Sequence, residues 1–225
     1  MQEFATATAT AVPTVLDIPA GRIRLIASDR SDATVEVRPA DASKARDVKA
    51  AEETGVEFRD GVLRIAAAPA KNRIMGNSGH VDVTVRLPAG SHVTATLAAA
   101  EFRGVGRLGD VVLDAAQARV ELDEAASVRL TVQDGDIALG RLHGPAEIST
   151  QKGDITVSEA VRGALGLTTR HGSISVAAAR GVSASLDAGT DSGRIHNALH
   201  HTDGSAAALT IRATTSYGDI TARSV

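Results

Sequence analysis

The sequence predicts an all-β protein whose main part is a parallel β-solenoid with about 18 residues per coil. Two observations carry this prediction. Short segments of alternating apolar and polar residues recur at a fixed period, and a polar turn with glycine stands inside each repeat. The composition agrees, because only 2% of the residues are aromatic and a core of Ala, Val, Leu and Ile suits thin, regular layers.

Three consecutive blocks of 18 residues show the repeat. They read VRLTVQDGDIALGRLHGP, AEISTQKGDITVSEAVRG and ALGLTTRHGSISVAAARG. Stacking these blocks would place Leu130 over Ile148 and Ile137 over Ile155, with neighbouring strands parallel. We therefore expect residues 93–225 to form one continuous solenoid. An antiparallel sandwich stays open as an alternative, because hairpin strands also alternate.

The turn of each repeat is marked by a glycine and the residue after it. The spacing lengthens after Gly172, where ALHHTDGSA is interpreted as a loop inserted into one coil. The aspartates of these turns are expected to accept hydrogen bonds from turn N–H groups. The predicted structural turn residues are Gly135, Asp136, Gly153, Asp154, Gly172, Gly193, Gly218 and Asp219.

Residues 1–92 do not follow the repeat and are predicted to form an irregular, β-rich part that caps one end of the solenoid. Alternating runs on both sides of Arg59-Asp60-Gly61 predict a β-hairpin. The segment 41–53 predicts the one short helix, because it is rich in Ala, Lys and Glu and Asp41 can cap it. Residues 71–80 are predicted to be a loop.

The recurring motif of ISTQKGDITV and TSYGDITA, together with IPAGRIRLIASDRSDATVEVRP and VRLPAGSHV, gives the chain a family resemblance. It resembles a bacterial β-strand-repeat family of unknown function whose members carry the label "putative adhesin". The resemblance covers most of the chain and implies a β-repeat fold with an adhesin-like role. The chain departs from that label in its amino terminus, MQEFATATATAV, which lacks the basic and apolar regions of an export signal. We therefore expect a cytoplasmic location.

Three patterns could carry ligand chemistry. Residues 104–109 match the dinucleotide fingerprint G-x-G-x-x-G, but the next residues alternate like a strand, so a turn is the preferred interpretation. The aspartates of the turns could stack into a calcium ladder, although the calcium-binding nonapeptide is absent. A histidine cluster could bind metal, but its sequence resembles a loop; its members are His171, His196, His200 and His201.

The sequence contains no catalytic constellation, so we predict a non-enzymatic structural or protein-interaction protein without a cofactor. The net charge of −3 argues against nucleic acid as a partner. No apolar run reaches the length of a membrane span, so membrane insertion is not expected. The alternative is a carbohydrate-active enzyme, because parallel β-helices also host polysaccharide lyases and hydrolases. Its signature would be two carboxylates that face each other across a cleft.

The expected partner is a second copy of the chain or another protein, bound through a face or through the carboxyl-terminal edge of the solenoid. The last readable coil, LTIRATTSYGDITARSV, keeps its alternation almost to Val225. An uncovered coil presents unpaired backbone groups to a partner strand. The candidate interaction edge is therefore formed by Tyr217, Thr221 and Arg223.

Overall fold

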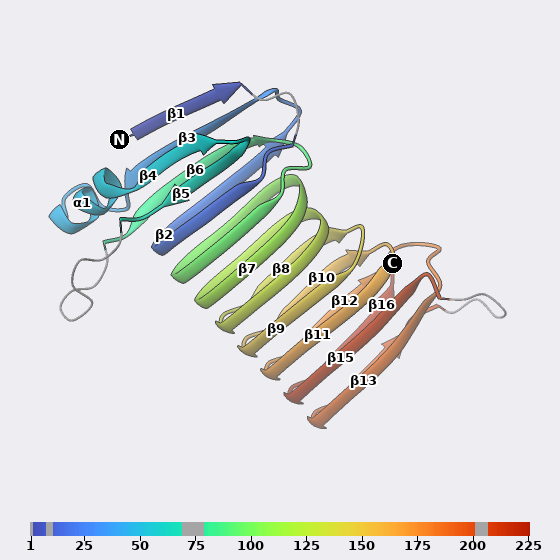
Figure 1. The fold of residues 1–225 in the computed structure, drawn as a ribbon. Helices are drawn as coiled ribbons and strands as arrows, with labels where there is room; N and C mark the ends of the chain where they lie inside the picture. Colours follow the sequence, from blue (N-terminus) through green and yellow to red (C-terminus); the bar gives the residue numbers. More distant parts are fainter. Residues whose placement is uncertain (1, 8–10, 69–78, 201–206) are drawn as a thin grey trace.

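The computed structural model describes residues 2–7, 11–68, 79–200 and 207–225, which form one mixed sheet of 16 strands and one helix (Figure 1). The amino-terminal elements are β1 Gln2–Ala7, β2 Thr14–Ser28, β3 Asp32–Pro39, α1 Ala45–Glu53, β4 Gly55–Arg59, β5 Val62–Ala66 and β6 Val81–Pro88. The other elements are β7 Val93–Asp134, β8 Ile137–Leu142, β9 Ala146–Lys152, β10 Ile155–Ala160, β11 Gly163–His171, β12 Ile174–Ala178, β13 Ala184–Ser192, β14 Ile195–Ala198, β15 Leu209–Tyr217 and β16 Ile220–Ser224.

Parallel strands form a stack with two rows, and the chain turns back between the rows at both ends of each strand (Figure 1). One row contains β7, β9, β11, β15 and β13, in that spatial order. The other row contains β7, β8, β10, β12, β16 and β14. We call each strand of the first row, together with the strand that follows it in the second row, a rung. The four rungs after β7 are β9/β10, β11/β12, β15/β16 and β13/β14.

The paired residues that the repeat predicts are neighbours in the stack. Ile137 pairs with Ile155 between β8 and β10, and Leu130 pairs with Ile148 between β7 and β9, in both cases in parallel strands. All four side chains are buried and point into the space between the rows. Among the described strands, antiparallel pairing is confined to β1 with β3, β3 with β6 and β4 with β5. The alternative of an antiparallel sandwich is therefore wrong.

The rung β15/β16 does not stand at the end of the stack. β15 lies between β11 and β13, and β16 lies between β12 and β14, so the chain passes one position and then returns to fill it. The prediction that Tyr217, Thr221 and Arg223 form an open edge is therefore wrong. Among the described strands, β13 and β14 have an open edge at this end.

Burial of the inward side chains explains this order. In β16, Ile220 and Ala222 are completely buried, whereas their register partners in β14, Ile195 and Asn197, are exposed. An interior position for β14 would bury the amide of Asn197 between the apolar side chains of neighbouring rungs. An unsatisfied buried amide costs about 1–3 kcal/mol, which is avoided when this rung is the last one.

The amino-terminal elements extend the two rows at the opposite end of the stack. The predicted hairpin is confirmed, because β4 and β5 pair antiparallel around Asp60 and Gly61, whose φ angles are 52° and 78°. The predicted helix begins later than expected: Lys44 is its N-cap, and Asp41 instead accepts hydrogen bonds from Ser43. The division into residues 1–92 and 93–225 stays a prediction. The predicted loop 71–80 lies outside the described residues, except for its last two.

Candidate functional site

The predicted turn glycines form one column along an edge of the stack, in the spatial order Gly135, Gly153, Gly172, Gly218 and Gly193. Each lies against the backbone of its neighbour. A Cβ atom on Gly172 would stand 2.0 Å from the carbonyl oxygen of Gly153, and a Cβ atom on Gly218 would stand 2.0 Å from that of Gly172. The close backbone approach leaves no room for a side chain, so the turn sequence is fixed by packing.

The residue after each glycine caps the turn of the next rung. The N–H of Asp154 donates to Asp136 Oδ1 at 2.9 Å, and the N–H of Ser173 donates to Asp154 Oδ1 at 2.7 Å. The N–H of Asp219 then donates to Ser173 Oγ at 3.4 Å, and the N–H of Arg194 donates to Asp219 Oδ1 at 2.9 Å. We call this series the acceptor ladder. It ends at Arg194, because a guanidinium group has no acceptor.

The acceptor ladder bears on the calcium alternative. Asp136, Asp154 and Asp219 each use one carboxylate oxygen for a backbone N–H, while calcium needs six to eight oxygen ligands. We therefore expect saturating Ca²⁺ or dialysis against a chelator to leave the melting temperature unchanged. Calorimetry with and without Ca²⁺ checks this prediction, and an increase of several degrees would contradict it.

The histidines singled out in the sequence do not come together as a metal site. The His171 ring stacks on Tyr217 with centroids 5.0 Å apart. His196 is exposed on β14, and the N–H of His200 donates to Ser224 Oγ. His201 lies outside the described residues. Within the described part of the chain, no group of three or more His, Asp or Glu side chains could hold a metal ion.

The G-x-G-x-x-G segment, residues 104–109, lies inside β7 and does not begin a helix. The N–H of Gly106 donates to Asp123 Oδ2 at 3.3 Å, so this donor is already used within the protein. A dinucleotide site needs such donors at a helix amino terminus, free for the pyrophosphate. The segment is therefore part of the stack. It includes a corner of β7, where Gly106 has a φ angle of 78°, which agrees with the preferred interpretation as a turn.

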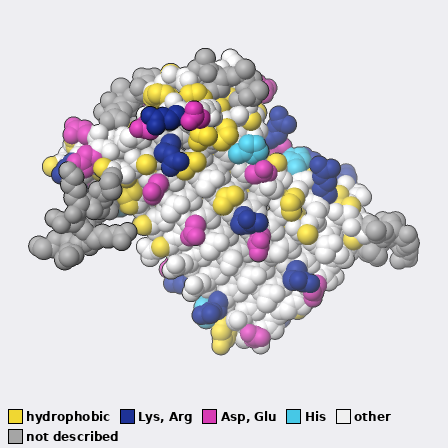
Figure 2. Space-filling view, in the orientation of Figure 1, with side chains coloured by type: hydrophobic (Ala, Val, Ile, Leu, Met, Phe, Trp, Pro, Cys, Tyr) yellow, Lys and Arg dark blue, Asp and Glu magenta, His cyan; other side chains and the backbone are white. Residues whose placement is uncertain are grey.

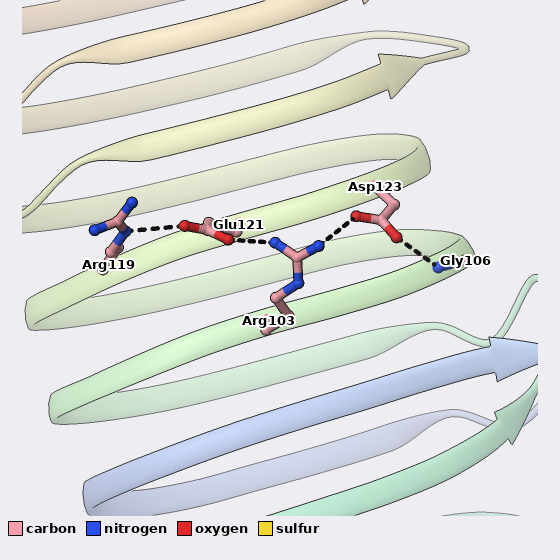
Figure 3. A network of polar contacts seen from close by, with 5 residues as sticks. All are labelled: Arg103, Gly106, Arg119, Glu121 and Asp123. Atoms are coloured by element: carbon pink, nitrogen blue, oxygen red, sulfur yellow. Dashed lines mark hydrogen bonds and ion pairs between the residues drawn. The ribbon is translucent and has the colours of Figure 1, made fainter.

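Alternating charges join neighbouring turns of β7 on the outer face (Figure 3). Arg103 forms ion pairs with Glu121 and with Asp123, the latter at 3.1 Å, and Arg119 Nε donates to Glu121 Oε1 at 2.9 Å. The Arg103 guanidinium is the main reason that the pKa of Glu121 lies below its ordinary value. Glu121 is therefore a stable carboxylate, which suits an ion pair.

This electrostatic pattern does not resemble a glycosidase site. A general acid needs a carboxyl group with a raised pKa. Four carboxyl groups of the described residues have a clearly shifted pKa, and in each case the pKa is lowered. They are Asp32, Asp41, Glu121 and Asp219, with the pKa of Asp41 at about 2. The Asp41 pKa is lowered mainly by hydrogen bonds from Ser43.

A serine, an aspartate and a histidine do meet at one corner of the stack, but in the wrong order for a hydrolase. Ser127 Oγ donates to Asp110 Oδ1 at 2.6 Å, and His92 Nδ1 lies 3.3 Å from Asp110 Oδ2. A nucleophilic serine needs the histidine next to its hydroxyl group, with the aspartate behind the histidine. Here the aspartate stands in the middle, so the serine is not activated.

The Glu121 ion pairs predict a pH dependence of stability. The unfolded-state pKa is near 4.5 and the folded value is lower, so the stabilisation is complete above pH 4.5 and is lost as the pH falls through the folded pKa. Wild type should therefore be more stable than Glu121→Gln at neutral pH, and the difference should disappear in acid. Urea unfolding from pH 7 to pH 3 measures it. Glu147→Gln, at an exposed ion pair, is the control, and a pH-independent difference would contradict the prediction.

The open end of the stack combines unpaired strand edges with apolar side chains. Among the described strands, β13 pairs only with β15, and β14 pairs only with β16. We call the inward side chains of this rung the apolar rim. Leu186 and Ala188 are partly buried, and Ile195 is 46% exposed. Sequence analysis missed this rim, although the polar Asn197 at an inward position signals a rung that is not covered.

Charges of both signs alternate over the face of the stack in Figure 2, without a large region of one sign. A nucleic-acid partner would need a basic stripe. Among the described residues, no helix is long and apolar enough to cross a membrane.

Several solved structures and one family profile are similar to this chain. No curated protein matches the chain significantly. Among solved structures, a "putative adhesin" from Parabacteroides distasonis is 19% identical, with 100% of this chain and 96% of that chain covered and a TM-score of 0.47. A "putative adhesin" from Bacteroides fragilis is 14% identical, with 100% and 97% covered and a TM-score of 0.42.

A "putative cell adhesion protein" from Clostridium sporogenes is 13% identical, with 100% of this chain and 99% of that chain covered and a TM-score of 0.38. The family profile of Toastrack DUF4097 matches residues 14–223, which is nearly the whole chain. The predicted resemblance to an adhesin-like β-repeat family is confirmed, and the chain belongs to the Toastrack DUF4097 family.

Proposed function

We propose that this protein is a non-enzymatic interaction module, built as a β-solenoid of about 18 residues per coil, that binds a protein partner through the open edges of β13 and β14. The carrying observation is the terminal rung, whose two strands each have one paired side. Uncovered strand edges are normally blocked in monomeric proteins, because they pair readily with other strands. A partner strand would satisfy these backbone groups and cover the apolar rim.

The catalytic alternative has weaker support. The shifted carboxyl groups are lowered in pKa, and the Ser127, Asp110 and His92 cluster has the wrong order. Incubation with a panel of polysaccharides should release no reducing ends, and release of such ends would favour the carbohydrate-active enzyme. A cytoplasmic location stays a prediction that cell fractionation tests.

Site-specific photocrosslinking in the native cell tests the interaction. A photoreactive residue at Gly189, which is exposed on β13 with open space around its Cα, should give a protein adduct. The same residue at Thr131, exposed on the outer face of β7 in the middle of the stack, is the control and should give none. Equal labelling at both positions, or no adduct at Gly189, would contradict the proposal.

A further inference from the structure

We propose that the partner of the terminal rung is the terminal rung of a second copy, docked with the two rows exchanged. β13 of each copy would pair with β14 of the other. This inference rests on the proposed function, because it names the partner for the same open edges. It is carried by the charges of the two strands, by the turn that joins them and by the end of the acceptor ladder.

The two edges carry opposite charge. The outer face of β13 presents Asp187 and Asp191, and the turn and outer face of β14 present Arg194 and His196; all four residues are exposed. Pairing of β13 with another β13 would bring acidic side chains together, which is unfavourable across neighbouring strands. Pairing of β13 with β14 brings acidic side chains to basic ones. Charge complementarity therefore selects the exchanged arrangement.

The geometry of the turn brings one specific pair together. β13 ends at Ser192 and β14 begins at Ile195, so Asp191 and His196 lie at the same end of the rung. A twofold axis along the strand direction keeps these ends aligned while it exchanges the rows. Asp191 of each copy then faces His196 of the other, and the contact occurs twice. Among the described residues, neither Asp191 nor His196 has an ion pair, whereas Asp187 pairs with Arg212 and Arg194 pairs with Asp219 in the same copy.

The same docking covers the apolar rim, and it does not require Arg194 to accept a hydrogen bond from another turn. Leu186, Ala188 and Ile195 would be buried against the rim of the second copy. A further parallel rung would need an acceptor at Arg194 for the N–H of its turn, and arginine has none. The strands of the two rows run in opposite directions (Figure 1). β13 of one copy would therefore pair antiparallel with β14 of the other copy, and this pairing needs no side-chain acceptor at Arg194. The acceptor ladder thus disfavours elongation of the stack by one turn hydrogen bond but permits this twofold contact.

Sedimentation velocity of the purified full chain, from low micromolar to near-millimolar concentration, tests the proposal with charge exchange. Wild type should dimerise with rising concentration. Asp191→Lys and His196→Asp should each weaken dimerisation at least tenfold, because the first removes the carboxylate that faces the imidazole and the second places two carboxylates in contact. The double variant should recover dimerisation. Asp114→Lys, the same change at an exposed position of β7 away from the rung, should dimerise like wild type.

Each other outcome overturns the inference. A wild-type monomer at all concentrations excludes the dimer, and a dimer that both single variants leave unchanged lies elsewhere on the molecule. Weakening without recovery in the double variant excludes the exchanged pairing. Unchanged melting temperatures of the variants show that these losses do not come from unfolding. A monomer that still gives a crosslink from Gly189 to another protein would refute the second copy and retain the proposed function.

Discussion

Replacing Gly172 with alanine should lower the free energy of unfolding by about 2–6 kcal/mol, with a melting temperature lower by roughly 10 °C. Two effects add. The φ angle of Gly172 is 153°, which side-chain-bearing residues rarely adopt, and the new Cβ would stand 2.0 Å from the carbonyl oxygen of Gly153. The contact is with backbone, so it cannot be relieved by a rotamer change. The rungs on both sides of Gly172 would have to separate locally.

Gly189→Ala is the matched control for this prediction. Gly189 lies on β13 without a positive φ angle, and a Cβ atom there would meet nothing within 4 Å. Its substitution should change the free energy of unfolding by less than about 0.5 kcal/mol. Differential scanning calorimetry of both variants gives the comparison. Equal destabilisation of the two variants would show that the glycine column does not hold the turns together.

Local signals predicted most of the stack. Alternation placed Leu130 beside Ile148, because a register shift of one residue would turn every inward side chain outward. The hairpin at Asp60 and Gly61 was predictable, because these residue types tolerate positive φ angles. The helix start was not, because Asp41 forms its own turn with Ser43. Asp41 could either cap the helix or form a turn with Ser43. Both choices are local in sequence, but the outcome depends on where the following chain packs.

The order of the last two rungs was not predictable from the repeat. The turns at Gly193 and Gly218 match the pattern equally well, so alternation alone gives the chain order. The two rungs differ in whether their turn residue can accept a hydrogen bond from a further rung. Arg194 offers no acceptor to a further turn, whereas Asp219 accepts from the N–H of Arg194. Reading the residue after each glycine as a donor or an acceptor would have identified the last rung, and with it the open edge.

A substitution at one inward position, made separately in the last two rungs, tests this order directly. Ala222 is completely buried, and its register partner Asn197 is exposed at the open end. Ala222→Asn should lower the free energy of unfolding by about 2–6 kcal/mol, because it buries an unpaired amide and overpacks the space between the rows. Asn197→Ala should change it by less than about 1 kcal/mol, since the lost hydrogen bond from the N–H of Leu199 is exposed.

The opposite stacking order predicts the opposite result. If the rungs followed the order of the chain, Asn197 would be buried beside Val176 and Ala222 would lie at the open end. Asn197→Ala would then stabilise the protein strongly, and Ala222→Asn would be tolerated. Urea unfolding of the two variants, with the midpoint and the slope fitted separately, distinguishes the two orders. The order in the structure, with β15/β16 between β11/β12 and β13/β14, requires that Ala222→Asn be the destabilising variant. Of the last two rungs, β15/β16 is the one with a neighbouring rung on both sides.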